Sequence, residues 1–251
     1  MKKTKLTWLY PDMLDLHGDR GNVFAFERVA KYIGVQLDVE RVNTYSDPID
    51  FAGSDIILVS PGETVVCAKV AQVLKEKRED IIDFINNRGV LVVIGNSLSI
   101  FAKETERSKE EGFEGLGIIN CKCTELRTAY SNDAVFTTEA FGEKMEIVGG
   151  QIQMLKFELG DDETPLGSTV YGYGNARDGK EGVIKKGFIH TNLLGPVMVK
   201  NPWFASAIIR RAAGNDGLTE DPFFDLEERT RETKSARQKC SREPSPKGRG
   251  A

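Results

Sequence analysis

The sequence predicts an α/β domain built on a mostly parallel β-sheet with helices on both faces. Strand-like and helix-like segments alternate from residue 5 to residue 105. Most of the strand-like segments are short apolar runs, which is typical of strands buried on both faces. The helix-like segments between them are long enough to connect parallel strands, so the alternation favours a layered α/β architecture.

The first half of this alternation runs to residue 42. Residues 5–10, KLTWLY, predict a strand, and the polar, Gly-rich stretch after it predicts a turn. Residues 23–34 predict a helix that ends at Gly34, a residue suited to a helix C-terminus. Residues 35–42, VQLDVERV, alternate between apolar and polar side chains and predict a second strand.

The second half contains the most apolar strand of the chain. Residues 54–63 predict a short strand that ends in a Pro-Gly turn, and residues 64–89 predict one or two helices. Residues 90–95, VLVVIG, predict the next strand, and residues 96–105, NSLSIFAKET, the helix after it. A buried strand that turns directly into a helix is a junction at which many enzymes carry a nucleophile.

After Gly112 the sequence changes to short β-like pieces divided by Gly, Asn and Asp. Residues 201–214 then predict a closing helix with a proline near its first turn. We therefore expect one domain over residues 1–214 and a charged tail over 215–251, largely disordered after residue 226.

Composition and charge argue against several classes of function. The formal net charge is −4, and from Leu226 onward eight Lys or Arg stand against four Asp or Glu. The rest of the chain therefore carries a net −8, which disfavours nonspecific nucleic-acid binding. No apolar run is long enough to span a bilayer, and the segment before PDMLD is too poor in apolar residues for a signal peptide. We expect a cytoplasmic protein without membrane insertion.

The four cysteines indicate neither a disulfide framework nor a metal centre. Cys121 and Cys123 form a C-x-C pair, but there is no second pair and the chain has only two histidines. We interpret them as partly buried thiols and expect no metal and no cofactor. Cys67 lies among apolar helical positions and is predicted to be a core residue.

Several stretches, in order, resemble one family. They are LYPDMLDLHGDRGNVFAFERVAKYIGV near the N-terminus, EGLGII, VYGYGNARDGKEGV, and NLLGPVMVKNPWFASAII near the end of the domain. They resemble the CobB/CobQ-like class I glutamine amidotransferases, in particular the GatD-type glutaminase subunit of lipid II isoglutaminyl synthase. The resemblance covers roughly residues 6–213 and implies a flavodoxin-like, doubly wound α/β fold, with the active site at the carboxyl ends of the strands.

The resemblance also implies a chemistry. In that family a Cys on the strand-to-helix elbow attacks the glutamine side-chain amide, a His acts as base and then acid, and backbone N–H groups hold the oxyanion. The ammonia passes to a partner, here expected to be a Mur-ligase-like ATP-dependent synthase in a heterodimer.

The residues that would carry this chemistry are replaced here. The family elbow reads C-G-G-Y-Q, and the matching position is Gly95, or Ile94 if the register shifts by one. In TNLLGP, Leu194 stands in the place of the family histidine. Arg127 matches a substrate-binding arginine of the family, with a surface arginine as the equal alternative. Gly62 and Asn96 are expected to line the vestigial pocket.

Other residues offer weaker substitutes for the missing pair. Ser97 and Ser99 follow the elbow, and His190 or His17 would be the only available base. The simpler interpretation is that the serines cap a helix and that the histidines are ordinary strand and loop residues.

The sequence thus supports three hypotheses. The first is a catalytically degenerate glutamine amidotransferase-like subunit in cell-wall precursor metabolism, with a Mur-ligase-like partner. The second is an active glutaminase or hydrolase that uses residues outside the family pattern. The third is a stand-alone module in which the backbone amides of LHGDRGN bind a small anionic ligand.

Overall fold

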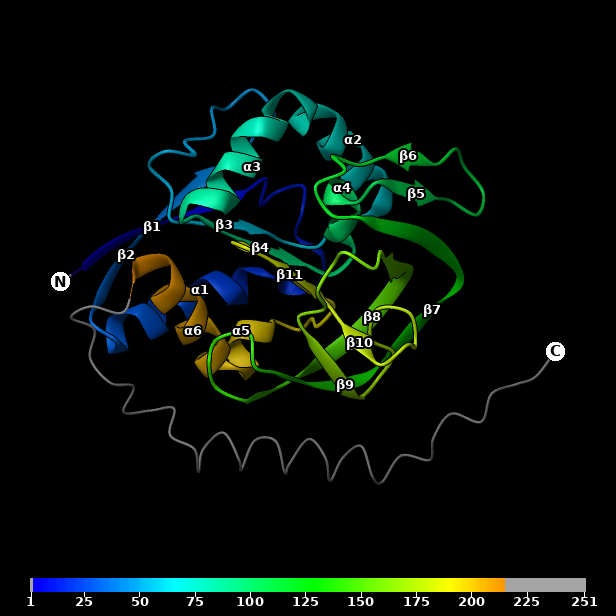
Figure 1. The fold of residues 1–251 in the computed structure, drawn as a ribbon. Helices are drawn as coiled ribbons and strands as arrows, with labels where there is room; N and C mark the ends of the chain where they lie inside the picture. Colours follow the sequence, from blue (N-terminus) through cyan, green and yellow to red (C-terminus); the bar gives the residue numbers. More distant parts are fainter. Residues whose placement is uncertain (1, 215–251) are drawn as a thin grey trace.

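A six-stranded sheet forms the centre of the molecule, in a computed structural model that describes residues 2–214 (Figure 1). The predicted tail, residues 215–251, lies outside the described residues. The strand order is β11-β12-β4-β3-β1-β2, and only β11 runs antiparallel to its neighbour. From β2 to β12 this is the flavodoxin-like order 2-1-3-4-5, so the predicted fold class is confirmed. Its strands are β1 (Lys2–Leu9), β2 (Val35–Val42), β3 (Ile56–Val59), β4 (Val90–Ile94), β11 (Val183–Lys185) and β12 (Phe188–Thr191).

Helices cover both faces of this sheet, as the continuous apolar strands predict. Figure 1 shows α2 and α3 above one face and α1 and α6 below the other. Each face has its own apolar core, because alternate strand residues point to opposite sides. The helices are α1 (Arg20–Tyr32), α2 (Thr64–Leu74), α3 (Arg78–Asn87), α4 (Leu98–Phe101), α5 (Val197–Lys200) and α6 (Pro202–Ala213).

A second, mostly antiparallel sheet lies beside the central one, at the right of Figure 1. The sequence predicts several short strands here, whereas the structure has two long ones, β7 and β8, paired along most of their length. A register irregularity between Glu125 and Tyr130 is the only break in that pairing. The strands are β5 (Glu104–Glu106), β6 (Phe113–Glu114), β7 (Cys121–Thr138), β8 (Met145–Leu159), β9 (Gly167–Tyr171) and β10 (Lys180–Glu181).

The predicted helix over residues 96–105 is mostly wrong. A 3₁₀ turn, η3 (Gly95–Ser97), leads into the single turn of α4, and Ala102 is already extended. The chain then joins the second sheet, where residues 104–106 pair with β7. This non-local pairing overrides the helical pattern of the local sequence.

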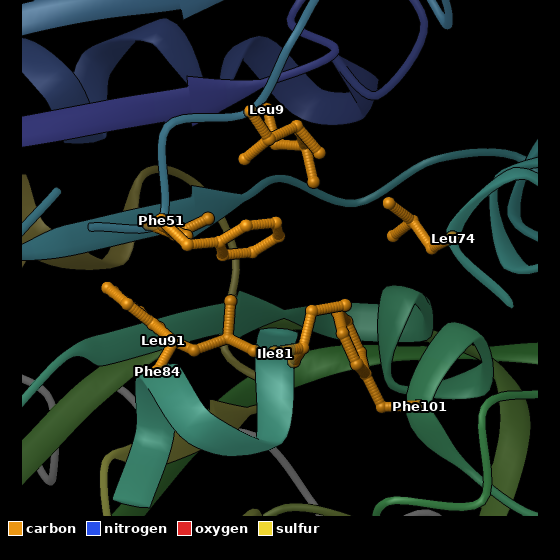
Figure 2. Close-up of a pocket in the computed structure, with 9 residues that line it drawn as sticks. Leu9, Phe51, Leu74, Ile81, Phe84, Leu91 and Phe101 are labelled. Atoms are coloured by element: carbon orange, nitrogen blue, oxygen red, sulfur yellow. The ribbon is translucent and has the colours of Figure 1, made fainter. Parts of the chain in front are cut away.

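An apolar pocket lies in the core between the central sheet and α3 (Figure 2). Its volume is about 10 Å³, close to the space of one water molecule. Phe51 and Phe84 meet there edge to face, with ring centres 6.2 Å apart. Its lining carries only apolar side chains, so nothing in it could orient a polar substrate. The lining residues are Leu9, Ile49, Phe51, Ile57, Leu74, Ile81, Phe84, Leu91 and Phe101.

None of the helices within residues 2–214 has the length and apolar character that crossing a bilayer requires.

Candidate functional site

The strand-to-helix elbow forms at Gly95. Ile94 ends β4 in an extended conformation and is fully buried, whereas Gly95 has a φ of +61°. A positive φ turns the chain sharply, and glycine adopts it without steric cost. The tip of the elbow is therefore Gly95 rather than Ile94.

Leu194 closes the space in front of this tip. A Cβ placed on Gly95 would lie 3.1 Å from Cδ2 of Leu194 and 3.2 Å from Cβ of Pro61. Leu194 is buried, and its backbone forms an antiparallel bridge with Gly150 of β8. Gly95 and Leu194, the two positions that the resemblance matches to the family Cys and His, thus lie close together in space, and a side chain at residue 95 would meet a leucine methyl group.

Parallel pairing brings these two positions together. β12 lies beside β4, with Thr191 opposite Ile94, so both chains leave the sheet at the same edge. Residues 192–194 follow one strand and Gly95 follows the other. This is the edge at which ligands bind in open α/β sheets.

A buried polar network holds the segment after β12. Glu181 accepts hydrogen bonds from the Thr191 hydroxyl (2.9 Å), the Asn192 backbone N–H (2.8 Å) and the Asn192 side-chain amide (2.9 Å). Burial raises the pKa of Glu181. Asn175 accepts from both the same Asn192 amide and the Gly182 N–H, each at 2.8 Å. The GYGN and EGV motifs therefore fix the backbone that leads into Leu194, a role that sequence reasoning did not assign.

The N-terminal and C-terminal motifs also fit each other. A Cβ on Gly21 would lie 2.4 Å from Cγ of Pro196, so only glycine permits this close approach. The neighbouring Asn22 accepts a hydrogen bond from the Met198 N–H at 2.8 Å. Asn201, fully buried, accepts from the Val148 N–H and donates to the Val148 carbonyl. These contacts join the N-terminal and C-terminal motifs in the folded chain.

His190 is engaged with the elbow rather than with a serine. Its Nε2 lies 2.9 Å from the Gly95 carbonyl oxygen, which can only accept, so Nε2 carries the proton and donates. The ring is fully buried and packs edge to face on Phe157. Burial lowers the pKa of His190 to about 4. Within residues 2–214, no hydrogen bond joins His190 to Ser97 or Ser99.

Both serines after the elbow are fully buried and bond to backbone carbonyls. The Ser97 hydroxyl donates to the Ser60 carbonyl and the Ser99 hydroxyl to the Asn96 carbonyl, each at 2.7 Å. Neither side chain caps the short helix, so the predicted capping role is wrong. The Ser97 hydroxyl instead links the elbow to the end of β3, and the Ser99 hydroxyl forms a hydrogen bond within the elbow.

Cys67 packs beneath the elbow. Its sulfur lies 3.7 Å from the Ser97 hydroxyl oxygen and 3.8 Å from the Gly62 carbonyl oxygen. Cys67 is fully buried, and burial raises the pKa of its thiol to about 11. It is a core residue, as predicted, and remains protonated at neutral pH.

The remaining predicted site residues are spread over the same edge and beyond it. The half-buried Asn96 donates to the Gly62 carbonyl, which joins the elbow to the loop after β3. Arg127 is exposed at the irregular part of β7, and His17 is exposed in the loop before α1. Neither side chain forms a hydrogen bond or ion pair with another residue in the range 2–214.

Asp19 is a buried carboxyl group at the start of α1. Burial raises its pKa to about 7. Ser60 follows β3 and accepts a hydrogen bond from Trp8 of β1, so Asp19 lies at the β1–β3 switch point of the sheet. An ionised carboxylate at this helix start would repel an anion, which weighs against anion binding by LHGDRGN.

Comparison with solved structures identifies the fold as that of the class I glutamine amidotransferases. One match is the structure of PurLQS from Thermotoga maritima, with a TM-score of 0.56 and 11% identity, covering 86% of this chain and 99% of that chain. A second is a crystal structure of a glutamine amidotransferase, with a TM-score of 0.53 and 13% identity, covering 82% and 98%. At these identities the likeness shows the fold alone.

Two characterised sequences are similar over most of the chain. The lipid II isoglutaminyl synthase (glutamine-hydrolyzing) subunit GatD of Streptococcus pneumoniae is 27% identical over 206 residues, 81% of this chain and 78% of that protein. The GatD subunit of Staphylococcus aureus is 28% identical over 221 residues, 84% and 85% respectively. No protein-family model matches the sequence. These relatives support the amidotransferase family expected from the motifs.

Substitution of Gly95 tests the contact with Leu194. We expect Gly95→Ala to lower the free energy of unfolding by about 2–4 kcal/mol, since it adds both left-handed strain and a tight contact. Gly117 is the matched control, because it has a φ of +63° and a Cβ added there would have no atom within 4 Å. Gly117→Ala should lower the free energy of unfolding by the backbone strain alone, about 1–2 kcal/mol. Equal losses in denaturant unfolding would contradict the contact.

The buried Asp19 and His190 should give opposite pH dependences. The Asp19 pKa rises from 3.8 to about 7 on folding, so ionisation costs stability as pH rises through that window. The His190 pKa falls from 6.5 to about 4, so protonation costs stability as pH falls through that window.

We therefore expect Asp19→Asn to gain stability relative to the unmodified chain between pH 4 and pH 7. His190→Gln should gain relative to that chain as pH falls from about 6.5 to about 4. The change in stability difference is up to about 4 kcal/mol for Asp19→Asn and up to about 3 kcal/mol for His190→Gln. Urea unfolding at a series of pH values measures both differences. A difference that stays constant with pH would contradict the burial of that group's charge.

Proposed function

We propose that this chain is a catalytically inactive glutamine amidotransferase-like subunit. The observation that carries the proposal is that residue 95 is a glycine and that Leu194 packs where a Cβ at residue 95 would point. Covalent glutamine hydrolysis by this fold requires a thiolate at the first position and an imidazole at the second. Neither side chain offers a nucleophile or a base, and oxyanion donors alone give only a small residual rate.

The contacts among the motifs around the elbow support the proposal that this region still has a function. The motifs around the elbow keep their mutual contacts, including Gly21 with Pro196 and Glu181 with the segment before Leu194. The two GatD relatives are named as subunits of a synthase, which implies a partner subunit for those proteins. We therefore propose that this chain also works as one subunit of a complex.

The proposed partner is a Mur-ligase-like, ATP-dependent enzyme that acts on a cell-wall precursor. In this role the chain docks on the synthase and regulates or stabilises it without supplying ammonia. A cytoplasmic location is part of the proposal, because the partner consumes ATP. Arg127, exposed on β7, is then a surface residue available to the partner or to a ligand rather than a proven substrate contact.

A glutaminase assay tests the inactivity. We expect the purified chain to release no measurable glutamate from glutamine, because residues 95 and 194 carry no reactive group. The Streptococcus pneumoniae GatD relative, assayed with its own synthase, is the positive control. Turnover by this chain, alone or with its partner, would overturn the proposal. Labelling of Ser97 or Ser99 by a serine-reactive phosphonate would instead favour the hydrolase hypothesis.

Co-purification from the native host tests the partnership separately. We expect a tagged chain to recover, in equal amounts, a protein with a Mur-ligase-like sequence. Recovery of the chain alone, or with proteins of other classes only, would contradict the proposed partner while leaving the inactivity result intact.

A further inference from the structure

A basic hollow lies at the amino ends of the central strands, at the opposite edge from the elbow. It has a volume of about 540 Å³. Its lining combines the start of β1, the loop between α3 and β4, the β11–β12 turn and the end of α6. Four basic residues line it, Lys2, Arg88, Lys186 and Arg211, and no acidic residue does.

These four cations have no carboxylate partner within residues 2–214. All four side chains belong to exposed residues. Arg211 donates to the Lys186 carbonyl, and the Lys2 ammonium lies 3.5 Å from the Gly214 carbonyl oxygen. Partial burial lowers the pKa of Arg211. Like charges gathered around one hollow repel one another, and an anionic group placed among them would relieve that repulsion.

The chain itself supplies such a group. Gly214 lines the hollow and is the last described residue, so the following segment starts there. Residues 215–225, NDGLTEDPFFD, contain Asp216, Glu220, Asp221 and Asp225 and no Lys or Arg. Four negative charges thus follow directly on a hollow with four positive ones. The basic part of the tail begins only after this segment.

The distances along the chain permit the contact. An extended chain spans at most about 3.3–3.6 Å per residue, so Asp216 stays within about 7 Å of Gly214 and Glu220 within about 20 Å. A short tether of this kind gives the carboxylates an effective local concentration in the millimolar range. We propose that the acidic segment 215–225 docks in the basic hollow of its own chain.

Zero-length coupling with a carbodiimide tests the docking on the full chain. The reagent joins a lysine amine to a carboxylate only where the two are in contact. We expect amide links from Lys2 or Lys186 to the carboxylates of residues 216–225, detected by mass spectrometry, and a several-fold lower yield at 0.5 M salt because screening weakens the attraction. Absence of these links would overturn the proposal.

Mixing ¹⁵N-labelled and unlabelled chains identifies the source of the carboxylate. Links within single chains support docking in cis. Links that join labelled to unlabelled chains, or that join the hollow to another protein, would overturn it in favour of an interface between molecules.

Hydrogen exchange of residues 216–225 gives an independent measurement. We expect Arg88→Gln/Lys186→Gln to raise the exchange rate of this segment at least threefold at low salt. The matched control is Lys144→Gln/Lys200→Gln, which removes the same charge from two exposed residues outside the hollow. Equal rates in both variants and in the unmodified chain would contradict the docking. None of these outcomes depends on whether the elbow is catalytically inactive.

Discussion

The structure of the candidate site depends on the parallel pairing of β4 with β12. That pairing places the ends of two strands, about one hundred residues apart in sequence, at one point on the sheet edge. The sharp turn at Gly95 and the segment before Leu194 can then touch. The hydrogen bond from His190 to the Gly95 carbonyl crosses the same pair of strands and fixes the turn to its neighbour. Without this pairing the two motifs would have no common site.

Around this point the motif residues stabilise one another. Asn22 accepts a hydrogen bond from the Met198 N–H, and Asn201 accepts one from the Val148 N–H. Glu181 accepts one from the Asn192 N–H, just after β12. Each of these polar side chains is buried, and each would destabilise the fold if left without its partners. Their presence therefore needs no catalytic explanation.

The sequence could predict the central sheet because its strands are apolar runs with long helical segments between them. It could not predict the lengths of β7 and β8. Hydrogen bonds between the two strands extend each of them through Gly, Asn and Asp residues that, in the local sequence, predict turns. The elbow could be located from VLVVIG, but its contact with Leu194 is non-local. Local rules predict that the serine hydroxyls cap a helix, whereas tertiary packing directs the Ser97 hydroxyl to the Ser60 carbonyl.

The left-handed backbone at residue 95 also bears on how this sequence could change its chemistry. A thiol introduced there alone meets the Leu194 methyl group and adds strain to the turn. An imidazole introduced alone at residue 194 faces a glycine with nothing to deprotonate. On the proposed function, a glutaminase site at this elbow would need both changes, a thiol at residue 95 and an imidazole at residue 194.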